Sequence, residues 1–184
     1  MDRSLIVNQR TGQRMRFGDP DEGGHPAASG QRRTLRIECW SPPSSEREPG
    51  HTHPEQASGF EVISGELAFW VHGKESRAGA GETVIVPAAT SHRFWNPTDA
   101  EAHYVQVFEP ALDTRGFFEV LFRLANEGKL GGSGMPKPLH LPVLFRAFGR
   151  EIRPSSPPWP VMSLVIAVLG PVAALRGYRQ PADL

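Results

Sequence analysis

The chain has 184 residues, which is enough for one domain with its own hydrophobic core and a further segment. Its 20 lysine and arginine residues are balanced by 20 aspartate and glutamate residues, so charge gives no reason to expect a nucleic-acid partner. The single cysteine, Cys39, excludes an internal disulfide and fits a reducing compartment. The opening MDRSLIVNQR has no apolar stretch of signal-peptide length, so we expect a cytoplasmic protein.

The pattern of the chain changes near residue 34. Residues 1–33 are polar and glycine-rich, and we expect an N-terminal arm in which DPDEGGHPAASG is a loop. Residues 34–110 contain short β-branched and aromatic runs bounded by Gly, Pro and Ser, namely TLRIECW, GFEVI, ELAFWVHG, ETVIVP, HRFWN and AHYVQVF. Such runs without intervening helices predict an antiparallel β-sandwich or barrel.

Residues 111–184 are predicted to form a helical C-terminal segment. In DTRGFFEVLFRLANEGKL, apolar residues recur at helical spacing, with Asp113 or Thr114 as the start and Gly128 as the end. A second helix is expected from Pro142 to about Ile152.

A third helix is expected from Pro160, broken at Gly170-Pro171. The stretch Trp159–Leu175 contains no charged residue. Its 17 residues are the lower limit of length for a helix that crosses a bilayer. We therefore expect a helix packed on the domain or across a homodimer interface, with membrane contact as the less favoured alternative.

Two histidines, His51 and His53, follow a Pro-Gly turn. Residues at i and i+2 of a strand project to the same face, so both imidazoles can converge on one cation. Alone, this pair is a weak signal. In the later stretch GETVIVPAATSHRFWN, Pro87 ends a strand and His92 begins the next, so an antiparallel neighbour can bring His92 beside the pair.

The two stretches together resemble the two motifs of the cupin superfamily, with a first motif of Pro49-Gly50, His51, His53 and Ser64-Gly65 and a second of Gly81, Pro87, His92 and Asn96. The resemblance covers about residues 34–110. It implies a mainly β fold, a small antiparallel jelly-roll-like barrel followed here by C-terminal helices. It also implies a metal site on His51, His53 and His92.

The sequence departs from the family pattern at two positions. The second motif usually has a glycine two residues after its proline, and Ala89 stands there. The first motif usually has an acid seven residues before its closing glycine, and Ser58 stands there. Glu61 is three residues further on and is expected on the opposite strand face. Glu55 reaches the site only if its turn is irregular, so Ser58 and Glu55 are the candidates for a substituted ligand or for a group that orients water.

Three further residues are candidates for an apolar pocket wall. Phe60 and Val62 share the parity of Ser58 along one strand, and Phe94 shares that of His92.

The sequence and the resemblance leave two functions open. The first is a divalent-metal protein, holding Fe, Zn, Mn, Ni or Cu, that binds or acts on a small molecule; if it is catalytic, the resemblance favours a dioxygenase-like reaction. The second is a metal-free module for small-ligand binding or dimerisation. The substitution at Ser58 is the reason to keep the second, because a site without a carboxylate holds a cation less tightly.

Overall fold

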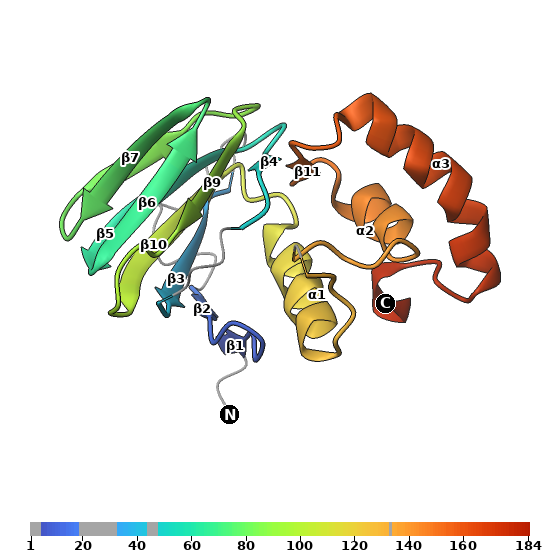
Figure 1. The fold of residues 1–184 in the computed structure, drawn as a ribbon, viewed down its shortest axis with the longest axis horizontal. Helices are drawn as coiled ribbons and strands as arrows, with labels where there is room; N and C mark the ends of the chain where they lie inside the picture. The colour runs from blue at the N-terminus through green and yellow to red at the C-terminus, as the bar shows by residue number, and fades with distance from the viewer. Residues whose placement is uncertain (1–4, 19–32, 44–47, 133) are drawn as a thin grey trace.

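The computed structural model describes residues 5–18, 33–43, 48–132 and 134–184, so the expected DPDEGGHPAASG loop lies outside the described residues. The described chain forms two antiparallel sheets followed by helices (Figure 1). The larger sheet has the order β1 (Leu5–Val7), β2 (Arg14–Phe17), β3 (Leu35–Ser41), β10 (Ala102–Glu109), β5 (Ala57–Ser64) and β8 (Thr83–Val86). The smaller sheet has the order β11 (Arg153–Pro154), β4 (His51–Thr52), β9 (His92–Trp95), β6 (Glu66–Val71) and β7 (Lys74–Gly79).

The core lies between the inward faces of the two sheets. Along β10, buried residues alternate with partly exposed ones, as expected for a strand with one face on the core. The phenyl rings of Phe60 and Phe94 lie 4.7 Å apart, and those of Phe60 and Phe69 lie 5.0 Å apart, which joins β5, β6 and β9 into one apolar cluster. Cys39 is fully buried in this cluster. The predicted fold class, antiparallel β-structure with C-terminal helices, is confirmed.

Each of the six predicted strands is present, and the structure adds five that the sequence pattern did not indicate. Two of these, β1 and β2, lie within the expected N-terminal arm, and β2 pairs with β3. The β7 sequence KESRAG buries only Ala78, so it carries no apolar alternation to be recognised. The other two, β4 and β11, have two residues each and are too short for a periodic signal.

The helices α1 (Thr114–Asn126), α2 (Leu141–Phe148) and α3 (Trp159–Leu175) follow the sheets. Asp113 caps α1 as predicted, because its carboxylate accepts a hydrogen bond from the Gly116 N–H. The second helix is shorter than predicted and ends before Gly149.

The predicted break at Gly170-Pro171 is wrong, because α3 continues through Pro171 to Leu175. Packing accounts for the difference. One face of α3 lies on α2, with Met162 and Ile166 buried against Phe145 and with Gly170 close to the Arg146 guanidinium. This burial holds the helix together across one missing backbone hydrogen bond. Within the described ranges, no helix combines the length and the apolar character needed to cross a bilayer.

Candidate metal centre and its cavity

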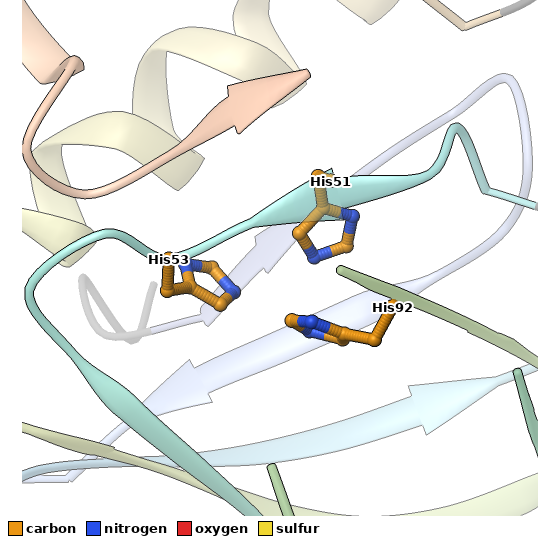
Figure 2. A group of neighbouring side chains, drawn as sticks. All are labelled: His51, His53 and His92. Carbon is orange, nitrogen blue, oxygen red and sulfur yellow. The ribbon is translucent and has the colours of Figure 1, made fainter. Parts of the chain in front are cut away.

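Three histidines meet where the smaller sheet approaches the helices. His51 is in β4 and lies opposite His92 of β9 in the strand register, and His53 follows β4 directly. Their rings point toward one another (Figure 2), with ring centroids 4.4 Å apart for His51 and His92, 5.0 Å for His51 and His53, and 5.2 Å for His53 and His92. One ligand nitrogen from each lies within 4.8 Å of the others, and all three residues are buried. The structure thus brings together the three histidines that the sequence proposed.

The backbone fixes which ring nitrogen faces the centre. Each Nδ1 lies within hydrogen-bond distance of a carbonyl oxygen: 3.0 Å from Pro49 for His51, 2.6 Å from Glu151 for His53 and 2.9 Å from Thr90 for His92. Because a carbonyl can only accept, each Nδ1 must carry the proton and donate it. Each Nε2 then keeps a lone pair, which is the arrangement found for histidines that ligate metals.

Burial keeps these imidazoles neutral. Desolvation, aided by the neighbouring His92, lowers the pKa of His53 to about 4 against the opposing effect of the bond to the Glu151 carbonyl. Desolvation also lowers the pKa of His51 well below its usual value, and it lowers the pKa of His92. Near neutral pH all three are therefore unprotonated at Nε2 and available as ligands.

The donor set fits a divalent cation of the borderline class. The Nε2 atoms of His53 and His92 are buried and lack a hydrogen-bond partner within the described chain. Unpaired buried acceptors that face one another are costly unless something is bound between them. Three imidazole nitrogens suit Zn, Fe, Cu or Ni, and such a site keeps at least one position open for water or a ligand.

The carboxylates that the sequence considered do not complete this centre. Glu61 pairs with Arg36, 2.6 Å apart, with its side chain 43% exposed on the outer face of β5, as its parity predicted. Glu55 pairs with Arg150 on the surface, 2.7 Å apart.

Position 58 itself faces the interior. Ser58 shares the buried face of β5 with Phe60, it is 1% exposed, and its Oγ has no partner within the described residues. In the loop before His92, Ala89 adopts φ 60°, the left-handed conformation that a glycine takes more easily.

A cavity of about 360 Å³ opens beside the histidines. On the side of the β-domain its lining is largely polar, with Glu48, His51, His53, Asn96 and Gln106. On the side of the helical segment it is apolar, with Phe117, Leu121, Leu130, Leu144, Phe145 and Ile152. Of the three predicted wall residues, Phe94 is among the lining residues, whereas Phe60 and Val62 are buried in the core.

The helical segment also holds the strand that carries His51. β11 pairs with β4, with Pro154 opposite His51, so a strand from the C-terminal segment lies at the edge of the smaller sheet beside the centre (Figure 1). The Ser155 N–H donates to the Gly50 carbonyl at 2.8 Å, and the Ser155 hydroxyl lies 2.6 Å from that of Ser91. Neither these contacts nor the Glu151 carbonyl on His53 could be read from the sequence, because they join segments 64 to about 100 residues apart without a motif.

Comparison with known proteins agrees with this arrangement of motifs. Residues 40–108 match the family model of the cupin domain, and all three histidines lie inside the matched stretch. The chain therefore contains a cupin domain, as its two motifs predicted. Among curated proteins, none matches the chain.

Several solved structures are similar to the chain. KdgF from Halomonas sp. is 12% identical with a TM-score of 0.48, covering 60% of this chain and 89% of that one. An RmlC-like cupin from Shewanella frigidimarina is 18% identical with a TM-score of 0.47, covering 61% and 89%. A sugar phosphate isomerase of the cupin superfamily from Silicibacter pomeroyi is 24% identical with a TM-score of 0.44, covering 55% and 62%. These three likenesses are too distant to indicate an activity.

Proposed function

We propose that the protein binds a divalent metal through the Nε2 atoms of His51, His53 and His92 and takes up a small, partly apolar molecule in the adjacent cavity. The observation that carries this proposal is the shared orientation of the three rings. Each Nδ1 is directed to a backbone carbonyl, which leaves the three Nε2 atoms near one another. Maintaining three buried, neutral imidazoles in this way is hard to explain by packing alone.

A metal held there would supply a Lewis acid that polarises a ligand oxygen. The residues of the chain would do the rest. The three histidines would fix the position of the cation, and the apolar wall from α1 and α2 would orient the body of the ligand and exclude water. The buried hydroxyl of Ser58, which has no partner within the described residues, would be free to hold a water molecule. If the bound metal is redox-active, dioxygenase-like chemistry is the class that we propose first.

Metal analysis of the purified protein tests this proposal. We expect about one equivalent of Zn, Fe, Mn, Ni or Cu in the wild type and a loss of at least tenfold in metal affinity on His92→Ala, because one ligand is removed. His103→Ala is the matched control, since His103 is a β10 residue that pairs with Glu38 at 2.9 Å and stacks on Trp40, away from the centre. A wild type that retains no metal after loading, or a His92→Ala variant that retains as much as the control, would contradict the metal site.

A second candidate function is a metal-free module that binds a small ligand. The hydroxyl in place of a carboxylate at Ser58 favours it, because it leaves no negative charge from that position to balance a cation. In that case small-ligand binding would persist unchanged in His92→Ala.

We also propose that the chain forms a homodimer through α3. Its outward face exposes apolar side chains at helical spacing, namely Val161, Leu164, Val168, Val172 and Leu175.

A further inference from the structure

Among the described residues that line the cavity, one has an acidic side chain, namely Glu48. Glu48 comes three residues before His51, and each of residues 48–51 lines the cavity. Two other described acids lie near the histidines. Glu55 pairs with Arg150 on the surface, whereas Oε1 of Glu151 accepts a hydrogen bond from the Asp113 N–H and its Oε2 is buried without a partner among the described residues.

The surroundings of Glu48 hold it between its two protonation states. Glu48 is partly exposed because it lines the cavity, yet the enclosing protein removes much of its hydration, and this desolvation raises its pKa to about 7. Burial raises the pKa of Cys39 and of Tyr104, and the charge of Glu48 adds to both shifts.

Burial is the cause of the raised pKa of Glu48. Arg10 also lines the cavity, and its guanidinium donates to the carbonyl oxygens of Gly131 and Gly132. The histidines of the centre are neutral, as their lowered pKa values require. A carboxyl group with a pKa near neutrality, facing a cavity, is suited to exchange a proton with whatever the cavity holds.

The residues that line the cavity limit the class of ligand that it can bind. One wall is apolar and aromatic, with Phe117, Leu121 and Phe145 from the helices, and it suits a ring or a short hydrocarbon. The β-domain contributes polar groups to the lining, namely Glu48, Gln106, His51 and His53. The Oε1 atom of Gln106 is buried without a partner within the described residues, so it too is available to a ligand. A molecule that fits this lining has an apolar body and a polar, proton-bearing end.

We propose that Glu48 is the proton-accepting residue of this site and that its ligand is a small aromatic or apolar molecule with a hydroxyl group. The inference rests on the proposed metal-dependent function. In this step the hydroxyl O–H bond breaks, a new O–H bond forms on the Glu48 carboxylate, and the electron pair stays on the ligand oxygen. The resulting oxyanion lies at the histidine end of the cavity, where a cation would stabilise it. No oxidant or reductant is required. Glu48 thus supplies the acid–base group that Ser58 does not provide.

The test uses 4-nitrophenol, a small aromatic hydroxyl compound whose ionisation changes its absorbance. Full-length protein loaded with zinc is titrated with the probe at pH 7 in weakly buffered solution, and bound probe, its ionised fraction, the protons released to the solution and zinc content are measured. In the wild type we expect bound probe to be largely ionised, with much of its proton retained on Glu48. In Glu48→Gln, which keeps the size of the side chain, the proton has no carboxylate to bind and passes to the solution, so we expect at least twice as many protons released per ionised probe bound. Zinc content should not change, because Glu48 is not one of the grouped metal ligands.

Glu61→Gln is the matched control, because Glu61 is an acid of the same domain that faces Arg36 on the outside of the sheet. This control should behave as the wild type. Equal proton release on probe binding in Glu48→Gln and wild type, with zinc bound in both, would overturn the role of Glu48 and leave the metal proposal standing. Zinc-loaded wild type that does not bind the probe at millimolar concentration would overturn the hydroxyl ligand. Wild type that retains no zinc would instead overturn the proposed function itself.

Discussion

The β-domain and the helical C-terminal segment contribute different things to one site. The β-domain provides the polar groups, with His51, His53 and His92 on or beside strands β4 and β9. The helical segment provides the apolar wall, the carbonyl that accepts from His53 and the strand β11. In the proposed function, the chemistry would come from one region, and selection and alignment of the ligand from the other. A cupin domain could keep its centre while the segment that covers it changes.

The largest expected effect that involves both regions is the change in unfolding free energy with pH that the buried His53 causes. Its folded-state pKa of about 4 lies below the unfolded value of 6.5, so the unfolded state binds more protons as the pH falls. In metal-free protein, the neutral His53 ring contributes about 3 kcal/mol to the free energy of unfolding. This contribution is complete above pH 6.5 and is lost as the pH falls toward 4.

Urea unfolding at pH 7 and at pH 4.5 measures this loss, and comparison with His53→Gln isolates it from titrating carboxylates. The variant should show a smaller drop in unfolding free energy than the wild type. Equal drops in both proteins would mean that His53 is solvated in the folded state, and that the contact with the Glu151 carbonyl does not hold it.

A second prediction concerns the β-domain alone. Ser58→Glu places a carboxylate on the buried face of β5, at the position where the family pattern has an acid. We expect metal affinity to rise at least tenfold, about 1.4 kcal/mol, because a carboxylate both ligates and neutralises the cation. In metal-free protein the same change should lower the melting temperature, because a buried unpaired carboxylate is costly.

Competition with a chelator measures that affinity. The matched control is Glu61→Ser, which changes an acid of the same strand on the opposite face. Unchanged affinity in Ser58→Glu would show that position 58 does not reach the centre.

The two regions also differ in how far the sequence predicts them. The strands β3, β5, β6, β8, β9 and β10 are marked by apolar alternation, and the three histidines by fixed spacing between turns. The centre could thus be located before the structure was known. The cavity could not, because its lining depends on how distant segments pack, and packing leaves no periodic trace in the sequence. Glu48 stands in an irregular stretch outside any helix or strand, where neither period nor motif draws attention to it.

Packing also explains why α3 is continuous although a break was predicted at Gly170-Pro171. Local propensity disfavours a helix through Gly170-Pro171, and the burial of Ile166 and Gly170 against α2 outweighs it. Tertiary contacts thus override local propensity at this one point of the C-terminal segment.

The smallest predicted effect tests whether the contact between the two regions is functional. Ser155→Ala removes the hydroxyl that lies 2.6 Å from that of Ser91, directly before His92, and keeps the backbone bond to Gly50. We expect a loss of about 0.5–1 kcal/mol in unfolding free energy, because the hydroxyl pair is exposed and its bond competes with water. Metal affinity should fall a few-fold, since β11 and the loop before β9 would be held less firmly.

Ser163→Ala, an exposed serine on α3, is the control and should change neither quantity. If Ser155→Ala lowers stability but leaves metal affinity at the control value, the C-terminal segment supports the fold without aligning the centre. If both fall together, the alignment of the centre depends on a region outside the matched cupin domain, because Ser155 lies well beyond residue 108.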